Sequence, residues 1–308
     1  MKLIYEGTDI TADVNIISAK IKDNASGVAD SLEIIFSDTE KLWRQWNPQK
    51  GDKIELQADG FSSGLMYVDE PGLSRGKFSI RALSTPLTAK TPRSKSWENV
   101  RFKKMAQDMA QGIGLAFETY DIADPLYDRL DQIDKANLEF LNERCILEGY
   151  CLKITDGKVV IYDERKLEQE SPVLTITPDM LIGDYEFFSI SSGLYSSCLI
   201  LYLSNTDRLI KYQFTPSNAP AGPILRPKIR ASNQGEAERF AKGLLRAANK
   251  YETQGRGFIR LNTSIAAGNV VQVSGMGAFD GSYFLESVIH NLTGGKSFLN
   301  MRKVLEGY

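Results

Sequence analysis

The sequence predicts a β-rich α+β protein in which two β domains flank a small α/β insert. Apolar and polar residues alternate with period two, between glycines, over much of residues 1–90, which is the pattern of β-strands. Helical periodicity appears in residues 91–168, and alternation returns in residues 169–308. We therefore divide the chain at these points, with a helical excursion near residues 234–251 inside the last domain.

The first β domain is predicted from short alternating segments such as SLEIIFS at residues 31–37. One helix is expected to interrupt it. Ser37 and Glu40 have the spacing of a capping box, in which two side chains satisfy the first backbone N–H groups of a helix. The KLWRQW segment that follows is the expected helix, and Asn47 with the proline after it ends that helix.

The insert is predicted from two amphipathic segments and one hairpin. An apolar pattern that begins at Val100 predicts a helix ending at Gly112 or Gly114. Residues 137–148 predict a second helix, ended by the glycine that follows. An Asp-Gly pair inside residues 150–164 predicts a tight turn between two strands. These elements together indicate a small α/β unit.

The last domain is predicted to be a second β domain around one helix. The proline-rich residues 215–230 predict a loop or an extended connection, because each proline withholds a backbone donor. The helix near residues 234–251 has one apolar face, and three strands follow it. Asp280 and Gly281 form a turn signal that leads into the strand containing His290.

Composition excludes several classes of protein. The chain has 37 basic and 39 acidic residues and a formal net charge of −2, whereas counterion release from nucleic acid requires a basic surface. No run of about 18 apolar residues predicts a membrane span, and the apolar N-terminal run is too short for a signal peptide. Cys145, Cys151 and Cys198 lack zinc-site and CxxC spacing, which favours buried thiols in a reducing compartment.

His290 is the only histidine of the chain, and we expect it to be a structural strand residue. Tyr283, Leu285 and Ser287 alternate with the residues on its own face, which is the period of a strand. Catalysis or metal binding by an imidazole needs partners, and the sequence offers neither a second histidine nor a His-x-x-x-His pair.

Two further groups of residues have a functional and a structural interpretation. Closely spaced aspartates suggest a calcium site, but these lack the central glycine and the closing glutamate of a calcium loop, and their spacing is typical of one solvated face. The aspartates are Asp121, Asp124, Asp128, Asp131 and Asp134. Three tryptophans, Trp43, Trp46 and Trp97, could form a sugar-binding platform, but packing is the commoner role of such residues. We expect neither a metal site nor a sugar site.

No enzyme motif is visible in the sequence. The glycines of SGMGAFDG precede a strand, whereas a dinucleotide-binding fingerprint opens a helix. The chain also lacks a phosphate-binding loop, a GxSxG elbow and a CxxC motif. Two glycosidase carboxylates could meet across a cleft, but no local signature supports them. We therefore expect no catalytic residue and no cofactor.

Near the C-terminus, the helix GEAERFAKGLLRAAN is followed by AAGNVVQVSGMGAFDGSYFLESVIHNL. These segments resemble the C-terminal signature of the phage late control gene D family, the baseplate hub proteins of contractile tails. The middle segments SIRALSTPL and DQIDKANLEFLNERCILEGYCLKITDGKVVIYDE are also similar to the family. The resemblance covers about residues 80–305, and the signature positions are Gly268, Asp280, Gly281, Tyr283 and His290.

The resemblance implies an architecture and a role. The two β domains would be β-barrels that resemble a tail-tube subunit, and three chains would form a ring of six such domains. The chain would join the sixfold tail tube to the threefold central spike of a contractile phage tail or phage-tail-like bacteriocin. Its partners would be itself as a homotrimer, the tail tube protein, a separate central spike protein and other baseplate proteins.

The same resemblance implies a location and leaves two alternatives open. The protein would lie in the baseplate of a virion or tail-like particle, after assembly in the bacterial host cytoplasm. The five signature positions would be structural. The alternatives are a tail-associated cell-wall hydrolase, for which the sequence shows no nucleophile with a base, and a carbohydrate-binding tail protein.

Overall fold

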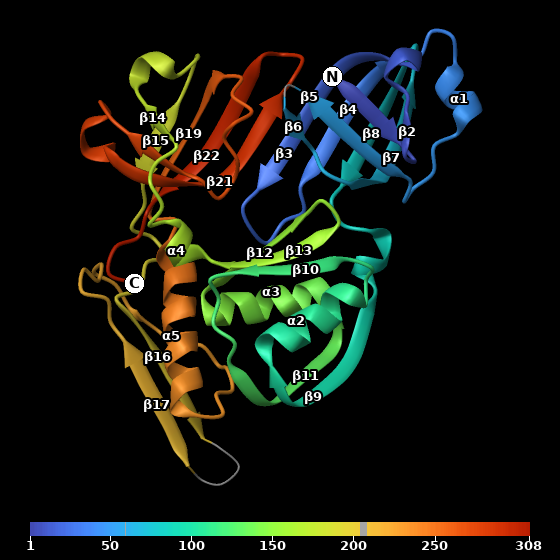
Figure 1. Ribbon diagram of the computed structural model, residues 1–308. Coiled ribbons are helices and arrows are strands. Elements are labelled where there is room, and N and C mark those ends of the chain that lie inside the picture. Colours follow the sequence, from blue (N-terminus) through green and yellow to red (C-terminus); the bar gives the residue numbers. More distant parts are fainter. Residues whose placement is uncertain (59, 204–207) are drawn as a thin grey trace.

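The computed structural model describes residues 1–58, 60–203 and 208–308. Its strands form a β-rich α+β protein, which confirms the predicted class. Figure 1 shows two lobes of strands side by side above a lower part that holds most of the helices. We call residues 2–83 the first lobe and residues 174–189 with 253–303 the second lobe. The lower part comprises residues 87–167 and 197–249.

The first lobe contains eight strands and one short α-helix among its described residues. The strands are β1 (Lys2–Tyr5), β2 (Thr8–Asp9), β3 (Asn15–Asn24), β4 (Ser31–Ser37), β5 (Lys53–Ala58), β6 (Phe61–Ser62), β7 (Met66–Ser74) and β8 (Lys77–Leu83), and the helix is α1 (Leu42–Trp46). Strand β4 alternates as expected: Leu32, Ile34 and Phe36 are buried, while Glu33 points outward. This alternation places one face of the sheet on an apolar core.

The second lobe contains six strands among its described residues. They are β14 (Leu174–Ile176), β15 (Glu186–Ser189), β19 (Thr253–Arg260), β20 (Val270–Val273), β21 (Gly281–Asn291) and β22 (Lys296–Lys303). Its core is separate from that of the first lobe and includes Val271, Leu285 and Leu299. Each lobe therefore buries its own apolar face.

The strands of both lobes belong to one 14-stranded sheet, whose main path runs β15-β19-β22-β21-β3-β4-β8-β7-β5-β1-β2 among the described residues. The path crosses from the second lobe to the first where β21 pairs antiparallel with β3. No closed barrel forms among these strands, which corrects the expectation of two β-barrels. One side of β21 pairs with β3 of the first lobe, so the strands of the second lobe do not close into a barrel of their own.

The lower part surrounds a third core. Its elements are β9 (Pro92–Arg101), α2 (Phe102–Gln111), β10 (Ala116–Tyr120), β11 (Leu126–Ala136), α3 (Asn137–Glu148), β12 (Tyr150–Thr155), β13 (Lys158–Asp163), α4 (Glu164–Leu167), β16 (Ser197–Leu203), β17 (Leu209–Phe214), β18 (Ile224–Leu225) and α5 (Gln234–Asn249). Helix α5 is the predicted helical excursion, and its Phe240 and Leu245 share a core with Phe102 and Leu141 of the insert. The division at residues 90 and 168 stays a prediction.

Helices α3 and α5 approach closely because a glycine lies at their contact. A Cβ atom on Gly243 of α5 would lie 2.5 Å from the carbonyl oxygen of Ile146 and 2.6 Å from that of Leu147. Helix α3 ends as predicted at Gly149, whose φ of +76° is the left-handed conformation that glycine adopts without strain. The position of α5 therefore depends on the absence of a side chain at residue 243.

The structure corrects two local predictions. Helix α1 has no capping box: its N-cap residue is Lys41, which makes no side-chain capping bond, and the backbone N–H of Trp43 donates to Oδ1 of Asp38 at 3.1 Å. Val100 lies in β9 and pairs with Tyr127 of β11, so the predicted helix begins two residues later, as α2. The predicted turn at Asp156 and the following glycine is confirmed, and it joins β12 to β13.

Candidate functional site

His290 is fully buried in β21, and both of its ring nitrogens have partners. Nε2 lies 3.2 Å from the carbonyl oxygen of Ile265, and Nδ1 lies 2.9 Å from Oγ of Ser297. Because a carbonyl only accepts, Nε2 carries the proton and Nδ1 accepts from the serine hydroxyl. Burial lowers the pKa of the imidazole, against the smaller opposite effects of the Ile265 carbonyl and Asp23. The geometry is that of a neutral packing histidine.

His290 lies where the two lobes join. It is opposite Ile21 in the pairing of β21 with β3, and its ring meets Phe61 of the first lobe edge-on, with 5.2 Å between centroids. Backbone hydrogen bonds extend the junction at both ends, from Ala25 N to the Glu286 oxygen at 2.9 Å and from Leu292 N to the Ala19 oxygen at 3.0 Å. A continuous ladder of backbone bonds therefore connects the two lobes.

Three other signature positions shape the backbone next to this strand. Gly268 has a φ of +96°, and its N–H donates to the Leu285 carbonyl at 2.8 Å. Asp280 accepts the backbone N–H of Met276 through Oδ1 at 2.6 Å and so closes a short turn. Gly281 has a φ of +139°, which L-amino acids with a side chain rarely adopt. These residues set the start and the path of β21.

Tyr283, the fifth signature position, is a core residue of the second lobe. Its side chain is fully buried, and its hydroxyl donates to the Phe279 carbonyl at 2.8 Å. The ring meets Phe187 of β15 edge-on, with centroids 5.7 Å apart. Burial raises the pKa of this phenol to about 12, so it stays protonated. All five signature positions therefore have structural contacts.

A second junction connects both lobes to the lower part. Lys153 of β12 forms an ion pair with Asp23 at the end of β3 and donates to the carbonyl of Asn24 at 3.0 Å. The other oxygen of Asp23 accepts the backbone N–H of Ala267, in the second lobe, at 2.8 Å. Nearby Asp30 is buried: burial raises its pKa to about 7, an effect that Lys153 opposes and Asp23 reinforces.

A buried ion network ties β22 to α4. Arg302 has no exposed surface, and its guanidinium contacts Glu286 of β21 at 2.5 Å and Glu164 of α4 at 3.0 Å. Glu168, just after α4, pairs with the same guanidinium. Desolvation alone would raise the pKa of Glu164, but Arg302 and its other cationic neighbours outweigh it and hold that pKa well below the usual range.

Helix α5 supplies the remaining cations of this network. Arg246 contacts Glu164 at 3.2 Å and also pairs with Glu168, and Lys250 contacts Glu164 at 2.8 Å. Three carboxylates thus meet three cations. Such a network holds geometry because each charge would be costly if left alone in the interior.

The aspartates and tryptophans considered as a calcium site and a sugar platform have separate structural contacts. Asp124 accepts the N–H of Lys103 at the start of α2 at 2.9 Å, and Asp131 pairs with Arg129 on β11. No cluster of three or more His, Cys, Asp or Glu side chains able to hold a metal ion occurs in the part of the chain that the structure describes. Trp97 is buried and stacks on Phe140 with centroids 5.9 Å apart.

The other two tryptophans belong to the first lobe. Trp43 is buried and stacks on Phe78, with centroids 5.2 Å apart and rings nearly parallel. Trp46 contacts Trp43 edge-on and is partly exposed. Trp43 and Trp97 therefore pack in two different cores, and the three tryptophans do not share one platform.

All three cysteines are buried and free, as expected. Burial raises the pKa of each thiol, to about 11 for Cys198 and further for the other two. Cys151 also contacts the carboxylate of Glu164 at 3.2 Å, which disfavours a thiolate there. A thiol that stays protonated is a weak nucleophile.

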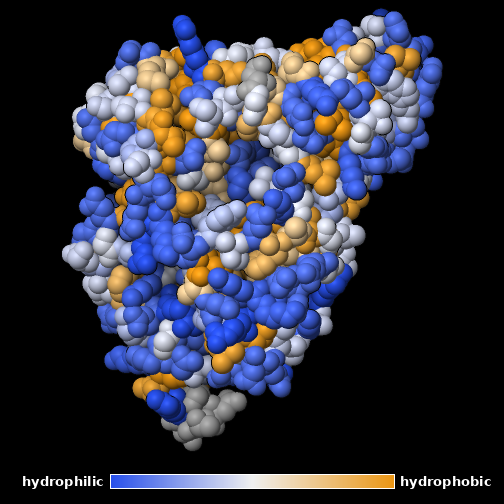
Figure 2. Space-filling model, in the orientation of Figure 1, coloured by the Kyte–Doolittle hydropathy of each residue, from blue (hydrophilic) through white to orange (hydrophobic). Residues whose placement is uncertain are grey.

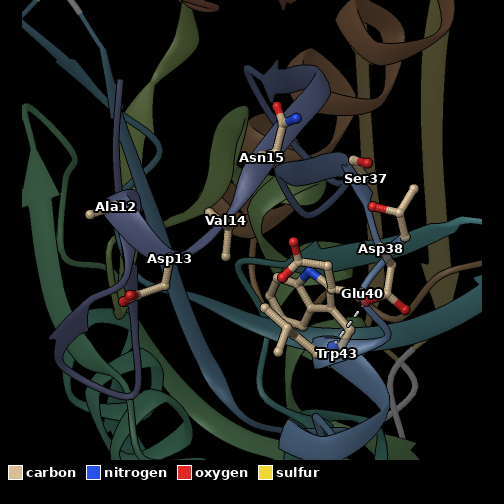
Figure 3. A pocket seen from close by; sticks show the side chains of 10 residues that line it. Ala12, Asp13, Val14, Asn15, Ser37, Asp38, Glu40 and Trp43 are labelled. Atoms are coloured by element: carbon tan, nitrogen blue, oxygen red, sulfur yellow. Dashed lines mark hydrogen bonds between the residues drawn. The ribbon is translucent and has the colours of Figure 1, made fainter.

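In two of the described pockets a carboxylate has hydrogen-bond partners. Figure 3 shows a pocket of about 270 Å³ in the first lobe, where one oxygen of Asp38 bonds to the backbone of Trp43. A larger pocket, about 520 Å³, lies beside α5, and there Glu148 pairs with Arg239 at 2.6 Å and accepts from Tyr127 at 2.5 Å.

The exposed surface carries apolar residues at strands that extend from the body. Figure 2 shows apolar surface beside the far end of the β16–β17 hairpin, where Leu201, Leu203 and Leu209 are each more than half exposed. Leu203 and Leu209 are opposite each other in the pairing. No helix of the described residues has the length and apolar character to cross a membrane.

Comparisons with known proteins identify the fold. No family model matches the sequence, and no curated protein matches it. The 43 kDa tail protein of prophage MuSo2 from Shewanella oneidensis superimposes with a TM-score of 0.74, over 98% of each chain at 13% identity. The tail protein from Neisseria meningitidis superimposes with a TM-score of 0.75, over 98% of this chain and 95% of that one, at 15% identity.

A third structure comes from a related type of apparatus. The E. coli c3393 protein, a component of the type VI secretion system described as similar to the T4 tail proteins gp27 and gp5, superimposes with a TM-score of 0.63 at 10% identity. The match covers 100% of this chain and 78% of that chain. The chain described here therefore shares its fold with these two tail proteins and with the secretion-system component.

Proposed function

We propose that this protein is a structural baseplate hub, which joins the sixfold tail tube to the threefold central spike of a contractile phage tail or phage-tail-like bacteriocin. The observation that carries the proposal is the junction of β21 with β3, which makes one continuous sheet from two lobes. A chain with two lobes side by side contributes two of the six units of a ring, so three chains present a pseudo-sixfold face.

The similar solved structures support this role. Two of them are named as tail proteins and match this chain over nearly its whole length. The third belongs to a type VI secretion system and is described as similar to tail proteins of T4. The late control gene D resemblance, which covers residues 80–305, agrees with this group. In this role the chain belongs to the baseplate of a virion or tail-like particle and is assembled in the bacterial host cytoplasm.

The proposed partners follow from the position between tube and spike. They are two further copies of this chain, the tail tube protein, a separate central spike protein and neighbouring baseplate proteins. The division into residues 1–90, 91–168 and 169–308 is part of the proposal, with tube-like units at both ends. The signature positions Gly268, Asp280, Gly281, Tyr283 and His290 act structurally, by setting the strand that joins the lobes.

Electron microscopy of particles that carry a tagged copy of the chain tests the proposal. We expect three copies per particle, located between the end of the tail tube and the spike. Label on the sheath or on fibres, or six copies per ring, would contradict the hub role. The alternative of a cell-wall hydrolase is tested by incubating the purified protein with peptidoglycan, and clear solubilisation would favour that alternative.

A further inference from the structure

The two lobes repeat the same order of strands. In the first lobe β4 pairs with β8, β8 with β7, and β7 with β5. In the second lobe β19 pairs with β22, β22 with β21, and β21 with β20. All six pairings are antiparallel. These four strands of the first lobe therefore have counterparts in the second, although the sequence shows no residue-level repeat.

The correspondence extends to single backbone features. Gly51 has a φ of +93° and donates to the Val68 carbonyl at 2.7 Å, as Gly268 with a φ of +96° donates to the Leu285 carbonyl at 2.8 Å. Positions 51 and 268, like positions 68 and 285, are 217 apart in sequence. One residue after each carbonyl the pairing with the next strand has an irregularity, which is the mark of a β-bulge. Strand β7 is thus the counterpart of β21.

Strand β15 is the counterpart of β3, because the two strands occupy the same place in the strand order of their lobes. Strand β3 pairs with the outer side of β4, and β15 pairs with the outer side of β19, the counterpart of β4. An oppositely charged pair marks the shared register: Lys20 faces Glu33 in the first lobe, and Glu186 faces Arg256 in the second. In this register Phe187 corresponds to Ile21.

The junction inside the chain uses β21 and β3, so the counterparts of both junction strands remain available. Among the described residues, residues 70–74 of β7 pair with β8 alone, and β15 pairs with β19 alone. Each strand thus has one side without a partner. Figure 1 shows these two strands toward opposite sides of the upper layer, one in each lobe. A head-to-tail contact between copies can therefore use both.

We propose that β7 of one copy pairs antiparallel with β15 of the next copy, with Leu73 opposite Phe187 of that copy, as His290 is opposite Ile21 within the chain. This interface deepens the proposed function and rests on it, because a closed ring of three chains repeats the contact three times. Each copy then has a β7 edge in one contact and a β15 edge in the other, and no sheet edge of this kind is left open.

The exposure of apolar side chains agrees with this interface. Leu73 is 54% exposed, whereas its counterpart His290 is fully buried at the internal junction. On β15 the flanking residues Tyr185 and Ile190 are 45% and 43% exposed. Pairing of the two strands covers these residues in the same way as the internal junction covers His290. The interface therefore removes apolar surface from water at both strands.

Because of Pro71, the proposed pairing of β7 with β15 has one backbone hydrogen bond fewer than the pairing of β21 with β3 inside the chain. Its counterpart is Val288, and the bonds of Glu286 and Leu292 to β3 show that alternate residues of β21, including Val288, face β3. Proline has no N–H to donate, but its carbonyl remains to accept a bond from the next copy. A proline at an open edge also suppresses pairing with unrelated strands.

Engineered disulfides test the register. In the proposed pairing Ser74 is opposite Glu186 of the next copy, so the double variant Ser74→Cys, Glu186→Cys should give covalent trimers on oxidation at high protein concentration. The matched control is Ser74→Cys, Ser189→Cys, which places the second thiol three residues out of register. The native cysteines are buried and serve as an internal background. Efficient cross-linking of the control pair, or a chain that stays monomeric at every concentration, would overturn the proposal.

A substitution on the free surface of the single chain tests the contact itself. Leu73→Lys should abolish the trimer in light scattering while the melting temperature of the monomer stays unchanged. Leu126→Lys, at a leucine of similar exposure on β11 in the lower part, should leave the trimer intact. A trimer that survives Leu73→Lys, with tagged protein still located between tube and spike, would overturn this interface and keep the hub role. Tag located elsewhere in the particle would overturn the hub role as well.

Discussion

The guanidinium of Arg302 lies 3.0 Å from the carboxylate of Glu164, although the two residues lie on the last strand of the second lobe and on the short helix α4. This contact belongs to a network in which all the charges are largely removed from water. Its place between the second lobe and α5 means that the orientation of the upper and lower parts depends on it. Several measurements can test such structural roles.

Arg302→Met should lower the free energy of unfolding by about 3–5 kcal/mol, because it leaves buried carboxylates without their cation. Urea denaturation followed by circular dichroism measures this loss. Arg129→Met is the control, since Arg129 is about half exposed and solvent screens its ion pairs, so this substitution should change stability far less. Equal losses in the two variants would contradict a structural role for the network.

Asp30→Asn should change how stability depends on pH. The folded-state pKa of about 7 lies above the unfolded value, so the contribution of Asp30 is fully present below about pH 4 and is lost as pH rises through 7. The wild-type protein should therefore lose stability relative to Asp30→Asn between pH 4 and 7. Urea midpoints at a series of pH values give the comparison, and parallel curves would show that Asp30 keeps an ordinary pKa.

His290→Gln should leave folding and assembly intact and cost on the order of 1 kcal/mol, because glutamine can still donate and accept at the junction. His290→Asp should cost more, since it places a carboxylate in a buried site without a cation. Thermal unfolding and particle assembly are the two readouts. A His290→Gln protein that folds and assembles but has no function would show that the imidazole does chemistry.

Gly243→Ala should destabilise the lower part by about 1–3 kcal/mol, because the added methyl group would meet backbone carbonyls of α3 that cannot move aside cheaply. Gly235→Ala, in the first turn of the same helix, adds a Cβ that meets only two side chains, at 3.4 and 3.6 Å, and should be neutral or stabilising. Melting temperatures of the two variants decide the point, and a neutral Gly243→Ala would show that α3 and α5 are free to separate.

Local chemistry explains which elements the sequence predicts well. The end of α3 at Gly149 and the turn at Asp156 depend on residues that adopt a positive φ, so a few neighbouring residues suffice. The capping box at Ser37 failed because a neighbouring residue takes the helix N–H group, and the helical place of Val100 failed because another strand pairs with it. Asp38 takes the backbone N–H of α1, and Val100 pairs across to Tyr127 of β11.

Local sequence signals also predict the role of His290, but they do not predict the buried ion network. A lone histidine without partners indicates a structural residue, and the structure places His290 in a hydrogen-bonded core. The ion network was not predicted from the sequence, although Glu164 and Glu168, like Arg246 and Lys250, are each four residues apart. That spacing indicates one face of a helix. Arg302 comes from a distant strand, so no local signal could bring it to those four residues.

The sequence alone determined the α+β class, several local elements and a resemblance to baseplate hub proteins. Only the tertiary structure showed that the two lobes share one sheet and that five strands of the first lobe have counterparts in the second. The physical reason is that the repeat preserves backbone pairing and not the identity of side chains. Leu73 and His290 occupy equivalent places, yet one is exposed on an unpaired edge and the other is buried at a junction. Backbone pairing and register are conserved between the lobes, whereas side-chain identity follows the different surroundings of each strand.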